Sequence, residues 1–198
     1  EGGKVQAGET IFYSKSNEIV KFVSPVSGTL TKISRGAKRV ITELLIEADS
    51  QDTYKYFGVL SPETSSAEAI KARLLESGCW PFIMQRPYAV VADTEREPRD
   101  IFISALSTAP LANDSDFSLQ GKEKELQTAL TALSKLTSGK VHVGVGKSGS
   151  SPFNGLKDIT LYNVSGPHPA GNVGTLINKV APVNKGEIVW TIAPQDLA

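Results

Sequence analysis

A glycine-rich segment in the second half of the chain has the spacing of a nucleotide-binding loop. Gly144–Gly149 follows a GxGxxG pattern directly after the predicted strand Val141–Val145, and in dinucleotide-binding folds such glycines let the backbone approach a pyrophosphate. Ser150–Gly155 then interrupts the helix that should open there, and no acidic residue follows about 20 positions on to hold a ribose. A loop without a dinucleotide is therefore favoured. A P-loop is excluded because Val141 replaces its first glycine.

His168 lies in a segment whose composition predicts a turn of defined shape. Residues 165–174 read Ser-Gly-Pro-His-Pro-Ala-Gly-Asn-Val-Gly, and prolines and glycines fix turn conformations. Loops held in this way often bind something. Because no carboxylate or nucleophile can be identified as a partner for His168, binding or an interface is favoured over acid–base catalysis. A solvent-facing histidine in a structural loop is the alternative.

The densest apolar and aromatic stretch is residues 79–87, Cys-Trp-Pro-Phe-Ile-Met-Gln-Arg-Pro. Such side chains line sites for flat hydrophobic ligands or anchor interfaces. Burial in a core explains the same composition equally well, so both interpretations stay open.

Charged residues outside these segments do not form a catalytic set. Arg35–Arg39 is a basic turn, for which exposure to solvent is favoured over contact with an anionic partner or a membrane surface. No acid pair, Ser-His-Asp set or Cys-His dyad can be assembled, because Asp114, Asp116, Glu123 and Glu125 fall in predicted loops and helix starts. At a helix start a negative charge stabilises the helix dipole.

Composition narrows the class of protein. The chain has 198 residues, 40% of them hydrophobic, with 21 basic and 21 acidic side chains, which is typical of a soluble globular protein. The lack of a basic surplus argues against a nucleic-acid partner, and no apolar run approaches the roughly 20 residues that cross a bilayer. Cys79 is the only cysteine and the two histidines lie far apart, so neither a disulfide nor a metal site is expected within one chain.

The elements that would position these residues divide the chain into three parts. Residues 1–50 contain short β-rich segments separated by turn residues, which predicts a small β module. Residues 51–158 alternate strands with helices, which predicts an α/β layer domain with a largely parallel sheet. Residues 159–198 return to a period of two and predict a strand-rich end, which either belongs to the α/β domain or begins a third unit.

Helix signals in the middle part are clear. Ser61 and Pro62 predict a cap and first turn, and Gly78 predicts the stop of that helix. A second helix is predicted from an apolar stripe that ends near Gly139, at Leu126, Leu130, Leu133 and Leu136. Strands after residue 80 are predicted at 88–92, 101–106, 141–145, 159–162, 175–180 and 187–192, the first two of them buried.

The first part resembles the biotinyl/lipoyl-carrier type of barrel-sandwich hybrid. The resemblance rests on Val5–Phe12 and Ser24–Leu30. In that family a lysine at a hairpin tip carries the swinging cofactor, whereas here the usual position falls near Asn17 and no Met-Lys-Met or Asp-Lys-Ala pattern surrounds Lys15. The resemblance therefore implies the fold and not the carrier activity.

Four further segments, Arg35–Val40, Pro81–Tyr88, Ser165–Gly174 and Pro182–Trp190, are similar to the A subunit of the bacterial sodium-translocating NADH:quinone reductases. The resemblance runs nearly end to end. It implies a peripheral subunit on the cytoplasmic face of an inner-membrane complex that passes electrons from NADH to ubiquinone while exporting sodium ions. It also implies that the chain is a central piece of that subunit, truncated at both ends and inactive alone, and that its partners are membrane subunits.

The same resemblance implies kinship with the NADH- and flavin-binding subunit of complex I. In that relative a Leu-Glu-Ser-Gly-like helix end leads into a glycine-rich loop that cradles flavin phosphate. Here Leu75–Gly78 leads into Cys79–Arg86, whose side chains would obstruct a phosphate and whose Pro81 lacks an N–H. The middle part is therefore expected to be a degenerate version of that domain. No cofactor is expected in this chain, and flavins, iron–sulfur clusters and Na⁺ are expected on other subunits.

What remains is a ligand-binding or docking role, for which the resemblance implies a quinone. We hypothesise an aromatic-lined quinone pocket in which one polar side chain, from Arg86 or His168, hydrogen-bonds a carbonyl. The hypothetical site residues are Trp80, Phe82, Met84, Arg86 and His168. The alternative is a purely structural scaffold that docks onto the membrane subunits.

Overall fold

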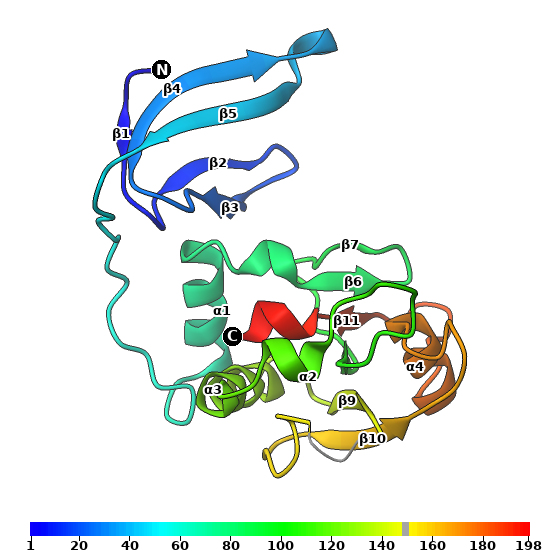
Figure 1. Cartoon of the computed structure of the whole chain (residues 1–198). Coiled ribbons are helices and arrows are strands. Elements are labelled where there is room, and N and C mark those ends of the chain that lie inside the picture. The colour runs from blue at the N-terminus through cyan, green and yellow to red at the C-terminus, as the bar shows by residue number, and fades with distance from the viewer. Residues whose placement is uncertain (148–150) are drawn as a thin grey trace. The chain divides into compact units, whose positions relative to one another are not determined.

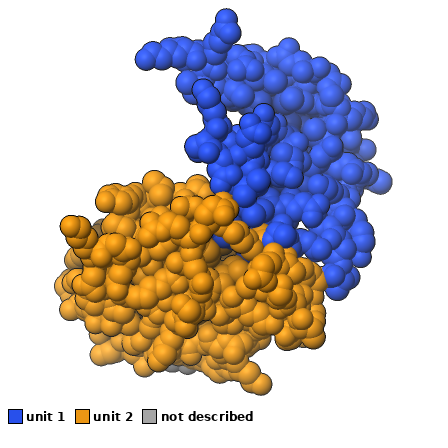
Figure 2. Space-filling view, turned by 180° about the vertical axis from the view of Figure 1, so that it is seen from behind, with its two compact units in different colours: residues 1–59, 72–81 blue, residues 60–71, 82–198 orange. Residues whose placement is uncertain are grey.

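The computed structural model describes residues 1–147 and 151–198 of the chain (Figure 1). The described chain divides into two compact units, one of residues 1–59 and 72–81 and one of residues 60–71 and 82–198 (Figure 2). Residues 148–149, the last part of the predicted glycine loop, lie outside the described residues.

The first unit is built from antiparallel strands, which confirms the predicted β module. Within residues 1–59, β1, β4 and β5 form one sheet, and β2 and β3 form a hairpin whose exposed turn contains Lys15. The basic turn Arg35–Arg39 connects β4 to β5 and is exposed, as expected of a solvated turn. The strands are β1 (Lys4–Val5), β2 (Thr10–Ser14), β3 (Asn17–Val23), β4 (Gly28–Arg35) and β5 (Ile41–Ala48).

A buried serine ties the segment after β5 to the start of β4. The Ser27 side chain is completely buried, its backbone N–H donates to Asp52 Oδ1 at 3.0 Å, and its hydroxyl accepts from the Thr53 N–H at 3.0 Å. Gly28 follows, and a Cβ there would lie 2.1 Å from the Glu47 carbonyl oxygen. The close approach of the two strands therefore requires glycine.

We expect Asp52→Ala to lower the free energy of unfolding by about 1–2 kcal/mol, because the Ser27 N–H would lose its acceptor in a buried position. Chemical denaturation of both proteins measures this difference. Asp49→Ala is the matched control, since its ion pair with Lys4 is long, at 3.9 Å, and exposed. Equal effects of the two substitutions would contradict a specific role for the Ser27–Asp52 pair.

The second unit is an α/β sheet. Among the described residues, six strands pair in the order β10-β9-β8-β11-β6-β7. The first four run parallel, and β6 runs antiparallel to both of its neighbours, which confirms the predicted largely parallel sheet. The last part of the chain, through β10 and β11, joins this same sheet. The strands are β6 (Met84–Arg86), β7 (Val90–Val91), β8 (Ile101–Ser104), β9 (Val141–Gly146), β10 (Thr160–Val164) and β11 (Val189–Thr191).

Helices bury the central strands of this sheet. The predicted leucine stripe lies on α3, where Leu126, Leu130 and Leu133 are buried, and α4 packs Leu176 and Ile177 into a cluster with residues of β8 and β11. Residues 141–145 of β9 are all buried, as expected of a parallel strand covered on both faces. The helices are α1 (Ala67–Glu76), α2 (Ser115–Ser118), α3 (Glu123–Ser134) and α4 (Val173–Val180), with short 3₁₀ turns at Trp80–Phe82 and Pro194–Leu197.

The predicted strand at Thr175–Val180 is wrong, because these residues form most of α4. Leu176 and Val180 are four residues apart, a spacing that satisfies a period of two and a helical period equally. Asn172 is extended at the position before the helix, and the adjacent residues Leu176 and Ile177 both pack into the same cluster. Adjacent residues would point to opposite faces in a strand, so this packing fits only the helix.

Two smaller predictions also differ from the structure. Of residues 88–92, only Val90 and Val91 form a strand, β7, which lies outermost in the sheet and, among the described residues, pairs only with β6. Val90 is 50% exposed, so this segment is not a buried strand. Helix α1 begins at Ala67, and Ser66 rather than Ser61 supplies the side-chain acceptor at its start, from the Ala69 N–H. The predicted stop at Gly78 is confirmed. Gly78 has a φ of +74°, and a Cβ there would lie 2.6 Å from Val23.

Candidate ligand-binding site

The strand order of the second unit reverses between β8 and β11. From β8 the chain passes outward to β9 and β10, whereas β11 lies on the other side of β8. In open α/β sheets, ligands bind beyond the carboxyl ends of the strands at such a switch point. A cavity of about 680 Å³ lies there, a volume within the usual range of small-molecule sites, about 300–1,000 Å³. We call it the switch-point cavity, and its wall includes Ser104, residues 171–175 and residues 191–196.

Three of the five hypothetical site residues line this cavity. Phe82 is the last residue of the 3₁₀ turn. Met84 and Arg86 come from β6, where a spacing of two puts them on one face while Gln85 is buried on the other. Trp80 is completely buried and does not line this cavity. Within the apolar stretch 79–87, Trp80 thus belongs to the core, whereas Phe82, Met84 and Arg86 form part of the cavity wall.

Arg86 carries an unpartnered donor at this wall. The residue is half-buried, and within the part of the chain that the structure describes its Nε atom is buried without a hydrogen-bond acceptor. A guanidinium is always charged and can only donate, and an unsatisfied buried donor costs free energy. Because Nε itself is shielded, a ligand in the cavity meets the terminal nitrogens of the same guanidinium, which can donate to an acceptor oxygen.

Five other polar side chains of the cavity fall into two groups. Ser104 and Thr191 are used by the fold, because the Ser104 hydroxyl donates to the Gly171 carbonyl at 2.7 Å and that of Thr191 donates to the Met84 carbonyl at 3.4 Å. The second group, Ser107, Asn113 and Ser115, makes no side-chain hydrogen bond to any described residue. Ser115 is only 7% exposed. The cavity therefore offers a ligand several polar groups that the fold does not use.

The start of α4 forms another part of the wall. Residues 173–175 line the cavity, and the Asn172 side chain makes no capping hydrogen bond, so it does not occupy the first backbone N–H groups of the helix. The positive end of the helix dipole favours an oxygen that carries negative charge. Burial raises the pKa of Asp196, a carboxyl that also lines the cavity.

His168 lies at a different cavity of about 760 Å³, between β10, α4 and the loop 165–170. Its Nδ1 lies 3.4 Å from the Thr108 hydroxyl, and its side chain is exposed. The structure thus separates His168 from Phe82, Met84 and Arg86.

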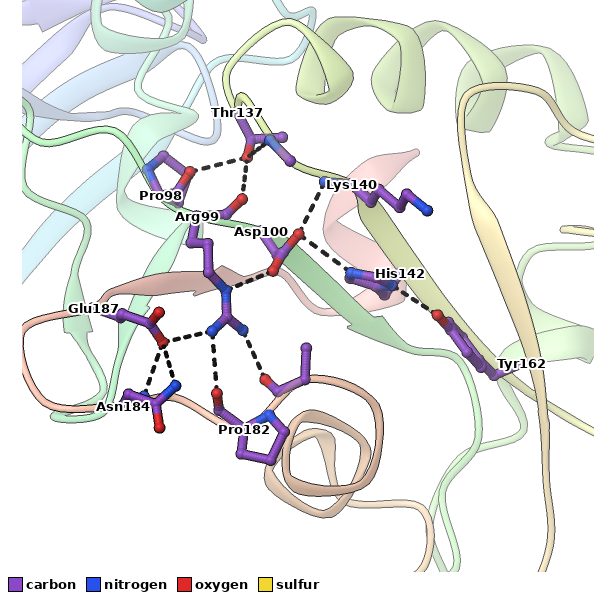
Figure 3. Close-up of polar contacts among 12 residues, drawn as sticks. Pro98, Arg99, Asp100, Thr137, Lys140, His142, Tyr162, Pro182, Asn184 and Glu187 are labelled. Carbon is purple, nitrogen blue, oxygen red and sulfur yellow. Dashed lines mark hydrogen bonds and ion pairs between the residues drawn. The ribbon is translucent and has the colours of Figure 1, made fainter.

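A polar network holds the amino ends of the parallel strands (Figure 3). Asp100, which precedes β8, accepts from the Lys140 N–H at 3.0 Å and from Arg99 Nε at 2.7 Å, and its Oδ1 lies 3.3 Å from His142 Nε2. His142 Nδ1 is 3.1 Å from the Tyr162 hydroxyl. The network therefore connects the beginnings of three adjacent strands.

Arg99 extends the network to the segment between α4 and β11. Its guanidinium donates to Glu187 Oε2 at 2.5 Å and to the carbonyl oxygens of Pro182 and Ala181 at 3.1 and 2.8 Å. Because the network lies at the strand ends opposite the switch-point cavity, its role is structural.

The protonation states in the network follow from burial and hydrogen bonding. Burial alone would raise the pKa of Asp100, but donors from Lys140, Arg99 and His142 outweigh it and hold the pKa below its usual value. Burial lowers the pKa of His142 despite the nearby carboxylate, and burial followed by the Asp100 charge raises the pKa of Tyr162. A neutral His142 with its proton on Nε2 satisfies both neighbours, donating to Asp100 and accepting from Tyr162.

We expect a pH dependence of stability from His142. The pKa of His142 is lower in the folded protein, so the unfolded chain takes up the proton first as pH falls below about 6.5. The free energy of unfolding therefore decreases, by no more than about 1.4 kcal/mol per pH unit, until the pH passes the pKa of the folded state. Denaturation at pH 7.5 and 5.5 should show a smaller difference for His142→Gln than for the wild type. His168→Gln, at an exposed histidine, should keep the wild-type difference. An unchanged dependence in His142→Gln would contradict this account.

The sequence reasoning missed the remaining residues of the cavity. Asn113 and Ser115 belong to a loop and a one-turn helix without a recognisable motif. Asn172, ahead of the apolar residues Leu176 and Ile177, was a usable signal, because it marks a helix start. The acids Asp114, Glu123 and Glu125 lie at helix starts as predicted, and Asp114 caps α2 by accepting from two backbone N–H groups.

The fold and cavity define a class, a small β unit followed by an α/β domain with a ligand-sized cavity at its switch point. Residues 1–49 match the family model described as the NqrA N-terminal barrel-sandwich hybrid domain, and residues 65–198 match the NqrA second alpha/beta domain. The predicted fold class is thereby confirmed.

Curated relatives agree with these domain matches. The chain is 35% identical over 198 residues to the A subunit of the Na(+)-translocating NADH-quinone reductase of Saccharophagus degradans, covering 99% of this chain and 44% of that protein. The same subunit of Haemophilus influenzae strain PittGG is 36% identical over 200 residues, with 100% and 45% covered, and that of Yersinia pseudotuberculosis serotype O:1b is 35% identical over 199 residues, with 100% and 44% covered. The chain belongs to the NqrA family, the A subunits of the Na⁺-translocating NADH-quinone reductases, as the resemblance predicted. It spans less than half the length of these relatives.

Proposed function

We propose that this chain forms part of a quinone-contacting site in a sodium-translocating NADH-quinone reductase, with the quinone ring in the switch-point cavity. The name of the relatives supplies the substrate class. The observation that carries the proposal is the guanidinium of Arg86, a charged donor at the wall of a ligand-sized cavity.

The chemistry of the wall suits a quinone. Phe82, which is 54% exposed, and Met84 offer apolar and polarisable surface to a flat ring. Arg86 donates to one carbonyl oxygen, and the start of α4 presents backbone N–H groups to an oxygen in the same cavity. Both groups stabilise negative charge, so they would favour an anionic, partly reduced quinone over the neutral oxidised form.

Within this proposal the chain binds and positions the quinone, and the electrons reach it from flavins and iron–sulfur clusters on other subunits, where the Na⁺ sites also lie. None of the helices in the described residues is both long and apolar enough to cross a membrane. We place the chain at the cytoplasmic face of the inner membrane, held there by its partner subunits.

Titration of the protein with a short-chain ubiquinone tests the proposal. Trp190 immediately precedes the lining residue Thr191, so its fluorescence should be quenched in a saturable way. Decylbenzene, which lacks carbonyls, is the matched control and should cause no saturable quenching. Quenching that rises linearly with ubiquinone, in protein of native stability, would contradict quinone binding.

The second candidate function is a scaffold that docks onto membrane subunits. The segment after β5 favours it, because Tyr54, Tyr56 and Val59 are 71%, 82% and 92% exposed, and large apolar side chains exposed together often mark an interface. Replacing all three by serine should weaken assembly with the partner subunits while leaving the quinone titration unchanged.

A further inference from the structure

The cavity beside His168 is the strongest feature that the proposed function does not use. It is walled by β10, by the loop 165–170 and by α4, and it has a volume of about 760 Å³. We call it the lysine cavity, because Lys147 and Lys179 line it. Its remaining lining residues are Tyr162, Asn163, Val164, Ser165, Gly166, Pro167, His168, Pro169, Ala170, Thr175, Leu176 and Val180.

The charged side chains that the structure describes at this cavity are both lysines. Lys147 follows the last residue of β9 and Lys179 lies in the last turn of α4, and none of the described residues that line the cavity is acidic. Within the described ranges 1–147 and 151–198, neither ammonium group has an ion pair or a hydrogen-bonded acceptor. Two cations without an internal counter-charge at one cavity favour an anionic ligand.

The floor of the same cavity is apolar. Leu176 is 4% exposed, and Val164 and Val180 pack against the core cluster that contains it. Proline and alanine side chains of the loop complete this surface. A purely hydrophilic anion would leave such a surface in contact with water, whereas an anion with an apolar body would cover it.

The walls are held by the fold itself. The Thr175 hydroxyl donates to the Pro169 carbonyl at 3.0 Å, and the Tyr162 hydroxyl is fixed by His142. The Ala170 and Asn172 N–H groups donate to the carbonyls of Pro167 and Pro169, each at 2.9 Å. A ligand therefore meets a largely preformed surface, which reduces the entropy cost of binding.

We infer that the lysine cavity binds an amphipathic anion, a carboxylate or phosphate group on an apolar body, with the acidic group at Lys147 and Lys179 and the body on Leu176, Val164 and Val180. A fatty-acid-like molecule in solution and the acidic lipid of a membrane share this chemistry. A neutral quinone does not, so the inference stands apart from the proposed function.

Calorimetric titration of the intact protein with decanoate, decyl phosphate and decanol tests the inference. Decanoate and decyl phosphate should bind saturably, decanol at least about 10-fold more weakly, and added salt should weaken only the two anions. The double variant Lys147→Gln/Lys179→Gln should lose about 10-fold in affinity for both anions. Equal binding of decanol and decanoate, or equal affinity of the double variant and the wild type, would overturn it.

A matched control and a second probe complete the experiment. Lys124→Gln/Lys185→Gln changes the net charge by the same amount at lysines outside the cavity and should keep wild-type affinity. Co-sedimentation with phosphatidylglycerol vesicles, lost in the cavity variant and absent with phosphatidylcholine, identifies a membrane lipid as the source. Decanoate binding without co-sedimentation identifies a soluble anion.

Discussion

Replacing Arg86 by Gln is expected to weaken the binding of a short-chain ubiquinone by about 10- to 100-fold. The guanidinium supplies a charged donor, whose hydrogen bond to a desolvated oxygen contributes about 1.5–3 kcal/mol. The shorter, neutral Gln side chain cannot reproduce that bond. Fluorescence titration of both proteins with the ubiquinone measures the change directly.

The same substitution should cost little stability, and this distinguishes a binding role from a structural one. Because Arg86 Nε is buried without an acceptor among the described residues, its removal eliminates an unsatisfied donor and should leave the free energy of unfolding unchanged or raise it. Arg96→Gln is the control, since Arg96 donates to the Gly186 carbonyl at 3.3 Å and does not line the cavity. Wild-type quinone affinity in Arg86→Gln would contradict the proposed contact.

Gly171→Ala is expected to destabilise the protein by about 1–3 kcal/mol and to abolish quinone binding. A Cβ at this buried position would lie 2.5 Å from the Leu106 carbonyl oxygen and 2.8 Å from the Thr108 nitrogen. The Gly171 N–H donates to the Thr108 hydroxyl and its carbonyl accepts from Ser104. Any shift that relieves the contact therefore separates the segment before α4 from the end of β8, and these two segments form the cavity wall.

Gly174→Ala provides a close comparison. Gly174 lines the same cavity three residues further on, but a Cβ there meets no atom of a described residue within 4 Å. In the first turn of α4, alanine should leave stability unchanged or raise it by up to about 1 kcal/mol. Thermal unfolding of the two variants compares them, and equal destabilisation would show that the close packing of Gly171 is not the cause.

Periodicity predicted most elements of the fold because the buried residues repeat regularly along the chain. The leucines of α3 and the apolar run of β9 meet that condition. It fails where two periods coincide, as at Leu176 and Val180, and where pairing decides burial, as at Val90 on the outermost strand. The order of strands in the sheet depends on contacts between distant segments, which composition does not reveal.

The candidate site was predictable to the extent that it is continuous in sequence. Phe82, Met84 and Arg86 lie within five residues of one unusual segment, so the sequence alone was enough to predict them as candidate ligand contacts. Placing His168 with them required the path of the loop after β10, which leads instead to the lysine cavity. The Asp100 network depends on the register of three strands and left no signal in the sequence.

Photoaffinity labelling with an azido-ubiquinone tests the central claim most directly. After illumination of the intact protein and digestion, mass spectrometry should find the label on residues 82–86, 172–175 or 191–196, and an excess of unmodified ubiquinone should suppress it. Suppressible label confined to other segments, or none that ubiquinone suppresses, would contradict a quinone in the switch-point cavity.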